Sequence, residues 1–207
     1  MPGIYVLAGV NGAGKSSITG AAIRALGGEY FNPDEAARRV IDANPGLDQT
    51  TANGLAWQQG RRLLERAIAE KLDLAIESTL GGSTIPKLLA QAATEGFEVR
   101  ITYVGLTSPE LHIERVRHRV STGGHDIPEA AIRRRWRHSR QNLVQLLPAV
   151  TELRVFDNSA DADPAGAHAP LPVLVLHVVR GEIVGPEDLS VTPTWAKPIV
   201  AAALKLR

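Results

Sequence analysis

At 207 residues, 44% of them hydrophobic and 22% charged, the chain has the composition of a globular protein with one sizeable core, which excludes a largely disordered chain. The net charge of +1 argues against a general binder of nucleic acid or membrane surfaces, and the absence of cysteine excludes disulfides, thiolate zinc sites and cysteine nucleophiles. No basic leader precedes the first apolar run and no stretch approaches the roughly 18 apolar residues that span a bilayer, so we expect a cytoplasmic protein without membrane contact.

Short β-branched runs alternate with longer segments rich in Ala, Leu and Arg over the first 158 residues. This alternation is typical of strand–helix–strand units, whose strands pair in parallel. It predicts an α/β protein with a three-layer α/β/α sandwich, built on a mostly parallel five-stranded sheet within a single domain over 1–207. The expected strands are 3–8, 29–32, 72–77, 98–106 and 152–156, and the expected helices are 15–26, 34–43, 50–71, 83–95, 108–120 and 129–147.

The composition changes after the core region, residues 1–158. Residues 159–172 are small, polar and rich in proline, which is typical of a loop. The apolar run that follows predicts a β-hairpin that turns at Arg180 and Gly181, with a last helix near the end of the chain. We expect this C-terminal extension, residues 170–207, to close the sheet or cover one of its edges rather than to carry chemistry.

The first predicted strand leads into "GVNGAGKSS", which fits the pattern G-x-x-x-x-G-K-[ST]. Glycines in such a loop let backbone N–H groups point into one concavity, and the helix that follows adds its positive N-terminal dipole. The lysine reaches the terminal phosphates and the following hydroxyl ligates Mg²⁺. The sequence therefore predicts that a nucleoside triphosphate with Mg²⁺ is bound by Gly9, Asn11, Gly12, Ala13, Gly14, Lys15, Ser16 and Ser17, with Ser16 on the metal.

The run 72–77 ends in "AIEST", which puts Glu77 and its neighbours at the carboxyl edge where open α/β sheets bind ligands. No apolar strand ends in the Asp that a motor ATPase normally carries, and no guanine-reading N/T-K-x-D stretch is present, so a motor ATPase and a GTPase are both disfavoured. Glu77 is expected either to help order Mg²⁺ through water or to accept hydrogen bonds from substrate hydroxyls. The alternative is that it only caps the following loop.

The stretch "FNPDEAARR" offers a second carboxylate. A kinase needs a group that accepts the proton of the attacking hydroxyl and holds that hydroxyl in line with the γ-phosphate. Asp34 follows a short predicted strand, where it could face the phosphate-binding loop. An alternative fits equally well, in which Asn32 caps a helix, Pro33 takes its first position and Asp34 only favours the helix dipole. This stretch alone leaves both alternatives open.

Eight arginines lie between Arg115 and Arg140, against only Asp126 and Glu129. Like charges about 4 Å apart repel by roughly 1 kcal/mol in water and about 4 kcal/mol at an effective dielectric of 20, so this density favours an anionic ligand. Two glycines in "STGGHDIP" offer a hinge between the two predicted helices. We expect residues 115–140 to form a lid that closes over phosphate and excludes water, the alternative being a solvated basic helix face.

Together these stretches resemble the zeta-toxin-like P-loop kinases, including their small stand-alone bacterial relatives. The resemblance rests, in order, on "AGVNGAGKSS", "FNPDEAA", "IESTLGG", "RVRHRVSTGGHDIPEAAIRRRWRHSRQNL" and "FDNS", so it covers roughly residues 3–160. It implies a P-loop NTPase fold with nucleoside-kinase-like strand order and ATP-dependent phosphorylation of a free hydroxyl on a small metabolite. In the toxins proper this metabolite is UDP-N-acetylglucosamine, and an antitoxin-like protein is a further expected partner.

The same resemblance distributes the chemistry over a few side chains. With Lys15 on the phosphates, it implies that Asp34 is the base that activates the hydroxyl and that Arg119 and Arg134 are the lid arginines on the phosphates. It also implies that Glu77 and Thr79 belong to the substrate pocket. Asn158 follows the last core strand, where it either lies near the adenine or belongs to a simple turn.

Two other functions are compatible with the sequence. The arginine helices could serve a kinase that acts on a polynucleotide 5′ end, but the segment has almost no aromatic side chains for stacking and the net charge is nearly zero, so a nucleic-acid partner is disfavoured. The chain could instead be a nucleotide-gated regulatory protein whose arginines contact a protein partner.

Overall fold

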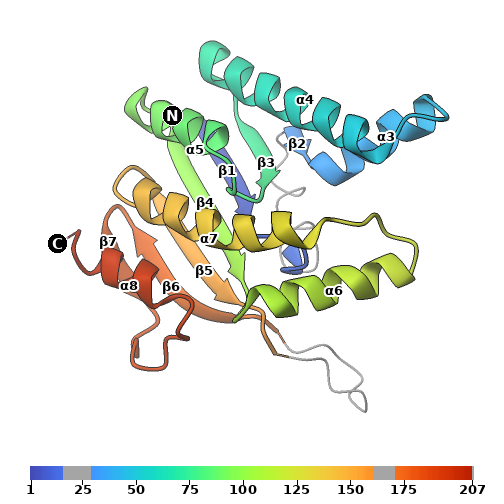
Figure 1. Ribbon diagram of the computed structural model, residues 1–207. Helices are drawn as coiled ribbons and strands as arrows, with labels where there is room; N and C mark the ends of the chain where they lie inside the picture. The colour runs from blue at the N-terminus through green and yellow to red at the C-terminus, as the bar shows by residue number, and fades with distance from the viewer. Residues whose placement is uncertain (16–28, 161–170, 207) are drawn as a thin grey trace.

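The computed structural model describes residues 1–15, 29–160 and 171–206 (Figure 1). Within these residues seven strands form one sheet in the order β2-β3-β1-β4-β5-β6-β7. The strands are β1 (Gly3–Ala8), β2 (Glu29–Phe31), β3 (Leu74–Ser78), β4 (Glu98–Gly105), β5 (Glu152–Asp157), β6 (Val173–Val179) and β7 (Glu182–Gly185).

The first five strands are parallel and follow the 2-3-1-4-5 order expected of nucleoside kinases. The register places Ala8 beside Ser78 on one side and Tyr103 on the other. The loop that follows β1 therefore emerges at the same edge of the sheet as the loops that follow β3 and β4.

The sheet is larger than the five strands expected, because the C-terminal hairpin joins it. β6 pairs antiparallel with β5, and β7 pairs antiparallel with β6. The hairpin turns at Arg180 and Gly181, as predicted, and both residues have positive φ angles of 48° and 83°. The extension thus continues one edge of the parallel sheet.

Helices connect the strands where the sequence predicts them, and the ends of α3 to α7 lie within one residue of the expected ends. The helices are α3 (Pro33–Ala43), α4 (Gln49–Glu70), α5 (Thr84–Thr94), α6 (Pro109–Ser121), α7 (Glu129–Leu146) and α8 (Lys197–Ala203). The helix expected over 15–26 lies, apart from Lys15, outside the described residues. Among the described residues, no helix combines the length and apolar composition that crossing a bilayer requires.

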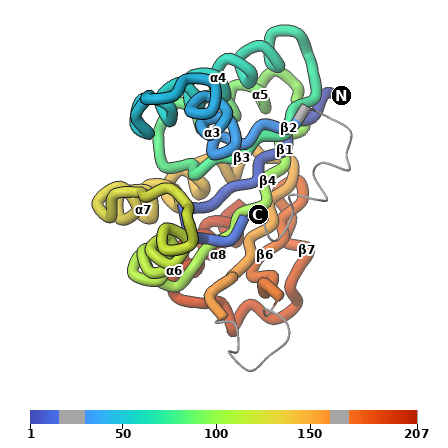
Figure 2. Tube along the Cα trace, turned by 90° about the vertical axis from the view of Figure 1, so that its right-hand side faces the viewer, coloured from blue at the N-terminus to red at the C-terminus, as the bar shows by residue number. Residues whose placement is uncertain are grey.

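The main hydrophobic core lies on one face of the sheet. Alternate residues of a strand point to opposite faces, and Ile4, Val6 and Ala8 of β1 belong to this core, to which α3, α4, α5, α7 and α8 all contribute side chains. Figure 1 and Figure 2 show how these helices are arranged around the sheet. Leu7 points the other way, into a smaller cluster with Val104.

The C-terminal extension packs into this main core through Trp195. Its side chain is 3% exposed, and its ring centroid lies 6.2 Å from that of Tyr103. A Cβ atom at Gly105 would lie 2.2 Å from the Trp195 ring, so only glycine lets the indole reach β4. Arg140 of α7 donates a hydrogen bond to the Trp195 carbonyl oxygen over 3.1 Å.

Replacing Trp195 with Ala should lower the free energy of unfolding by about 3–5 kcal/mol, because a buried indole is lost and its cavity cannot collapse fully. Urea denaturation of both proteins measures this difference. Trp57→Ala is the matched control, since Trp57 is 47% exposed. Equal losses in the two variants would show that the extension is not part of the core.

Candidate functional site

The phosphate-binding loop after β1 packs closely against the backbone of β4 and α6. Gly9 and Gly12 have φ angles of 145° and 83°, which side chains rarely adopt. A Cβ atom at Gly9 would lie 2.4 Å from the Val104 carbonyl oxygen, and one at Gly12 would lie 2.6 Å from that of His112. Both glycines are therefore needed for conformation and for close approach of the loop.

Asn158 closes the loop from the end of β5. Its side-chain amide donates a hydrogen bond to the Ala13 carbonyl oxygen over 2.9 Å. A Cβ atom at Gly14, whose φ is 81°, would lie 2.4 Å from the same amide nitrogen. The predicted contact of Asn158 with adenine stays a prediction, whereas its contact with the phosphate-binding loop is direct.

Lys15 is the first helical residue after this loop. Its ammonium group donates a hydrogen bond to the Gly9 carbonyl oxygen over 2.9 Å. Desolvation lowers the pKa of Lys15, while Glu77 and Asp34 oppose this shift. The charge of Lys15 thus interacts with both predicted carboxylates. Ser16 and Ser17, the other predicted ligands of phosphate and metal, lie outside the described residues.

Glu77 at the end of β3 is 7% exposed and is held by two neighbours. Its Oε1 atom accepts hydrogen bonds from the Tyr30 hydroxyl and, over 3.0 Å, from the Asn32 amide. Burial and the bond to Glu77 raise the pKa of Tyr30, which therefore stays protonated. The backbone N–H groups of the following loop are capped instead by the hydroxyls of Ser78 and Thr79, so Glu77 is not the cap of that loop.

Asp34 lies at the start of α3, where Asn32 performs the capping. The Asn32 side chain accepts hydrogen bonds from the backbone N–H groups of Asp34 (2.8 Å) and Glu35 (3.2 Å). The carboxylate of Asp34 is 46% exposed and lies 3.7 Å from both Arg119 Nη1 and His125 Nε2. The capping role expected in this stretch is thus taken by Asn32, while the Asp34 carboxylate is left facing Arg119 and His125.

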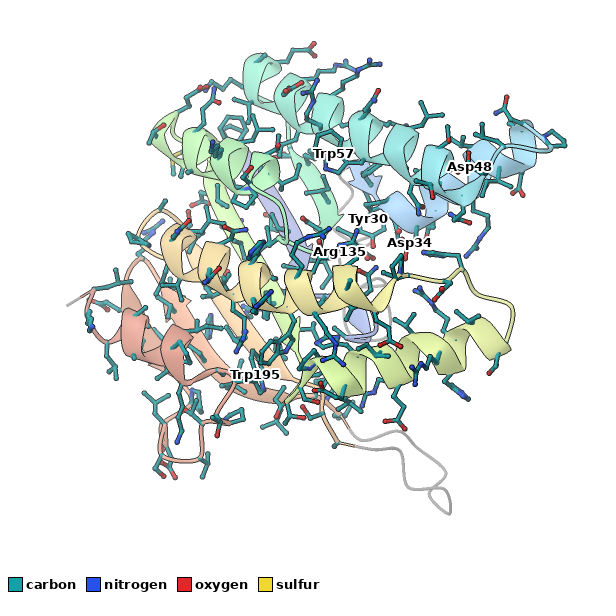
Figure 3. All side chains as sticks on the ribbon, viewed as in Figure 1. Tyr30, Asp34, Asp48, Trp57, Arg135 and Trp195 are labelled. Carbon is teal, nitrogen blue, oxygen red and sulfur yellow. The ribbon has the colours of Figure 1, made fainter. Side chains whose placement is uncertain are left out.

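A cavity of about 180 Å³ opens beside Asp34. Figure 3 shows Tyr30, Trp57, Asp34 and Arg135 gathered between α4 and α7. The walls come from the phosphate-binding loop, the ends of β2 and β3, one face of α4, the start of α5 and the α6–α7 segment. The lining residues are Asn11, Phe31, Pro33, Asp34, Asn53, Trp57, Gly60, Arg61, Ile76, Glu77, Ser78, Thr79, Leu80, Gly81, Gly82, Ile85, Pro86, His125, Ile127 and Arg135.

The α6–α7 segment brings His125 into the lining of this cavity and places Arg119 next to Asp34. Arg119 donates a hydrogen bond from Nη2 to the His125 carbonyl oxygen over 3.0 Å. Within the described part of the chain, Arg119 Nε and His125 Nε2 are buried without a hydrogen-bond partner. Burial lowers the pKa of His125, which favours the neutral ring. Sequence reasoning missed His125, although it is the one imidazole in "STGGHDIP".

The arginine of α7 that reaches the site is Arg135, not the predicted Arg134. Arg135 donates a hydrogen bond from Nη1 to Asn11 Oδ1 over 2.8 Å and lines the cavity, whereas Arg134 is exposed. The helical period explains the difference, because Arg135 shares a face with the buried Ile132 and Ser139. Burial lowers the pKa of the Arg135 guanidinium.

The arginine segment was expected to bind an anionic ligand, but part of its positive charge is paired with carboxylates of the protein itself. Two exposed arginines form ion pairs across the α6–α7 interface, Arg117 with Glu129 and Arg133 with Glu110. Arg140 stacks 3.5 Å from the Trp136 ring centroid. Among the described arginines, Arg61 and Arg135 line the cavity, and Arg119 lies 3.7 Å from Asp34, which also lines it. Within the α6–α7 segment, Arg119 and Arg135 are therefore the arginines placed to favour a phosphate there.

The described residues of the site offer Mg²⁺ few protein ligands. Among the described residues, no group of three or more His, Asp or Glu side chains is placed to hold a metal ion. Mg²⁺ in phosphotransferases is usually held by one or two protein groups together with phosphates and waters, and the buried Glu77 beside the phosphate-binding loop fits that arrangement.

Comparison with known proteins identifies the family. The chain belongs to the AAA_33 family, described as an AAA domain, which matches residues 4–144. An uncharacterized protein of Haemophilus influenzae is 30% identical over 128 residues, which cover 62% of this chain and 88% of the relative.

Two solved structures share the fold at low sequence identity. The AvrRxo1-ORF1:-ORF2 complex with ATP has a TM-score of 0.69 at 16% identity, and the match covers 98% of this chain but 64% of that chain. The PezAT toxin–antitoxin system of Streptococcus pneumoniae has a TM-score of 0.55 at 18% identity, over 76% of this chain and 68% of that chain. The chain therefore has the α/β P-loop kinase fold with a mostly parallel sheet, and narrower membership of the zeta-toxin-like kinases stays a prediction.

His112 of α6 fixes the position of the phosphate-binding loop. It is 1% exposed, and its Nδ1 donates a hydrogen bond to the Asn11 carbonyl oxygen over 2.9 Å. Burial lowers its pKa to about 4, so the buried ring is neutral at neutral pH.

This depressed pKa predicts a pH-dependent stability. Between the folded pKa of about 4 and the unfolded pKa of about 6.5, the unfolded state binds more protons, so stability falls as the pH drops. Moving from neutral pH to about pH 5 should remove roughly 2 kcal/mol through His112. His112→Asn keeps a donor near Asn11 but cannot titrate, so urea denaturation should show a pH dependence weaker by that amount. His138→Asn, at an exposed site on α7, should change nothing, and an unchanged slope in His112→Asn would refute the assignment.

Proposed function

We propose that this member of the AAA_33 family is an ATP-dependent kinase that transfers the γ-phosphate to a hydroxyl of a small molecule. The observation that carries the proposal is the shared cavity. Asn11 of the phosphate-binding loop and the carboxylate of Asp34 line the same space. A hydroxyl placed against Asp34 would therefore lie next to the loop that holds phosphate.

Three cations would stabilise the charge that develops during transfer. Phosphoryl transfer spreads negative charge over the oxygens of the moving group, so catalysis depends mainly on positioning and electrostatics. Lys15 directly follows the phosphate-binding loop, while Arg119 and Arg135 come from the α6–α7 segment. Besides desolvation, the charges of both arginines lower the pKa of Lys15. In this proposal Arg135 takes the role that the sequence assigned to Arg134.

Asp34 would act as the proton acceptor. The acceptor oxygen forms a bond to the γ-phosphorus, the bond from that phosphorus to the β–γ bridging oxygen breaks, and the hydroxyl proton passes to the Asp34 carboxylate, leaving ADP. Arg119 and His125, each 3.7 Å from the carboxylate, would hold Asp34 in orientation. Mg²⁺, when bound through Ser16 and, by water, Glu77, would neutralise charge on the phosphates.

Likeness to known proteins supports one candidate acceptor and one kind of partner. The resemblance to the zeta-toxin-like kinases makes UDP-N-acetylglucosamine one candidate acceptor, with Glu77 and Thr79 in its pocket. The AvrRxo1 structure is a complex of two chains with ATP, and PezAT is a toxin–antitoxin system, which supports an antitoxin-like partner. A polynucleotide acceptor is less well supported, because the exposed Arg117 and Arg133 already pair with carboxylates.

The proposed chemistry predicts a graded set of losses. Asp34→Asn should lower product formation by about 10²–10⁴-fold, because the proton acceptor is removed. Arg135→Gln should lower it by roughly 10²-fold, as expected for one donor to developing charge, while Arg134→Gln should stay close to wild type. Mass spectrometry of a metabolite panel that includes UDP-N-acetylglucosamine, incubated with ATP and Mg²⁺, measures the product. No product from any member, or unchanged product with Asp34→Asn, would defeat the proposal.

A further inference from the structure

One wall of the cavity takes no part in the phosphoryl chemistry proposed above. α4 contributes Asn53, Trp57, Gly60 and Arg61 to the lining. Their spacing of four, three and one residues places them along one face of the helix. This wall lies beside Asp34 in the same cavity, so it would contact whatever molecule presents its hydroxyl there.

Trp57 is the aromatic side chain of this wall. It is 47% exposed, whereas Trp195 is 3% exposed in the core. Large apolar side chains that stay exposed at a cavity often mark a binding surface, and an indole offers a flat face for a ring. Beside it, a Cβ atom at Gly60 would lie 2.5 Å from the Phe31 ring, so glycine lets a second aromatic side chain reach the cavity.

Arg61 adds a donor that the described part of the chain does not use. Its Nε atom is buried without a hydrogen-bond partner. The nearby Glu65 carboxylate is 3.6 Å away, in an ion pair whose side chains are 40% and 45% exposed, and such surface pairs contribute little. The guanidinium carbon lies 5.8 Å from the Trp57 ring centroid. A guanidinium next to a ring face suits a ligand with an anionic group beside a ring.

The two carboxylates in the cavity are engaged by partners other than Arg61. Glu77 accepts hydrogen bonds from Tyr30 and Asn32. Asp34 is faced by Arg119 and His125. Arg135 adds a further cation to the lining. The carboxylates therefore have partners of their own within the site, and the anionic group of a ligand would meet Arg61 on the α4 wall.

The size of the cavity limits the part of the ligand that it encloses. Its volume is about 180 Å³, and a cavity of roughly 150 Å³ in another protein holds one benzene molecule. The enclosed part of the ligand is thus about one six-membered ring.

We propose that the acceptor is a hydroxylated single-ring compound that carries a carboxylate or a phosphate. Its ring lies against Trp57, its anionic group pairs with Arg61, and its reactive hydroxyl faces Asp34. The transfer step rests on the proposed kinase function, but the binding preference is a separate property and can be measured without turnover.

The test uses Asp34→Asn with a non-hydrolysable ATP analogue and Mg²⁺, so that acceptors bind but do not react. Calorimetry measures the affinity for quinate, a ring carboxylate, and for glucose 6-phosphate, a ring phosphate. Their neutral counterparts are myo-inositol and glucose. At least one anionic probe should bind roughly 10-fold or more tightly than its neutral counterpart, because a charge-assisted hydrogen bond is gained. The two anionic probes distinguish a carboxylate from a phosphate, and UDP-N-acetylglucosamine tests the larger acceptor.

Substitutions on α4 assign this preference to residues. Arg61→Gln should remove the roughly 10-fold advantage of the anionic probe and leave the neutral probes unchanged. Arg62→Gln is the matched control, because Arg62 is exposed and is not part of the lining. Trp57→Ala should weaken anionic and neutral probes together, and Trp57→Phe should restore most of the binding. Thermal unfolding of each variant checks that it is folded.

Each outcome decides between the two proposals. Anion preference that Arg61→Gln removes, together with phosphorylation by the wild type, supports both. The same preference without phosphorylation by the wild type supports the α4 recognition site and defeats the kinase function. Phosphorylation without anion preference, or tightest binding of UDP-N-acetylglucosamine that is unaffected by Arg61→Gln, overturns the single-ring anionic acceptor alone. If the probes neither bind nor are phosphorylated, both proposals are defeated.

Discussion

The close approach of the phosphate-binding loop to β4 and α6 is the constraint on which the rest of the site depends. The carbonyl oxygens of Val104 and His112 occupy the space that side chains at Gly9 and Gly12 would need. The loop is therefore fixed by contact with the backbone of two elements, and His112 adds a hydrogen bond to Asn11 from the same helix. Arg119 lies near the end of α6, and His125 follows a few residues later. The same contact therefore also helps to position Arg119 and His125 beside Asp34.

Charge balance follows from that geometry. Lys15, Arg119 and Arg135 converge with Asp34 and Glu77 in a partly enclosed space, where electrostatic interactions are stronger than in water. Neither carboxylate is left without partners, since Glu77 is held by Tyr30 and Asn32 and Asp34 is faced by Arg119 and His125. A group of this composition tolerates added phosphate, because three positive charges then face it together.

The sequence was informative wherever one residue type has one physical reason to be present. The glycines after β1 were predicted because backbone conformation restricts them, and Glu77 and Asp34 were predicted because one lies at the end of a strand and the other just after one. The order of the five parallel strands was predicted from the resemblance to the zeta-toxin-like kinases. The sequence was less informative where the rotation of a helix decides which of several neighbouring residues points to the cavity. Three consecutive arginines precede Trp136, and only the packing of α7 through Ile132 and Ser139 turns Arg135, rather than Arg134, to the cavity. The sequence predicted that the C-terminal extension would close the sheet or cover one of its edges, but not that the hairpin pairs with β5. It also did not reveal that Glu110 and Glu129 would neutralise two of the arginines.

Most residues proposed to carry the reaction could be predicted from the sequence, whereas the residues proposed to select the acceptor could not. Residues at the ends of parallel strands have positions that the register of the sheet fixes, so their chemistry can be inferred from the amino-acid sequence. The α4 wall has no such restriction, because Trp57 and Arg61 face the cavity only through the rotation of α4 on the sheet and its packing against α3. Substitutions on that face can change which molecule fits without moving Lys15, Asp34 or Arg135. In the proposed kinase, a phosphoryl-transfer site held at the sheet edge would therefore serve different acceptors through one helix face, and this face is the part of the cavity that would select the acceptor.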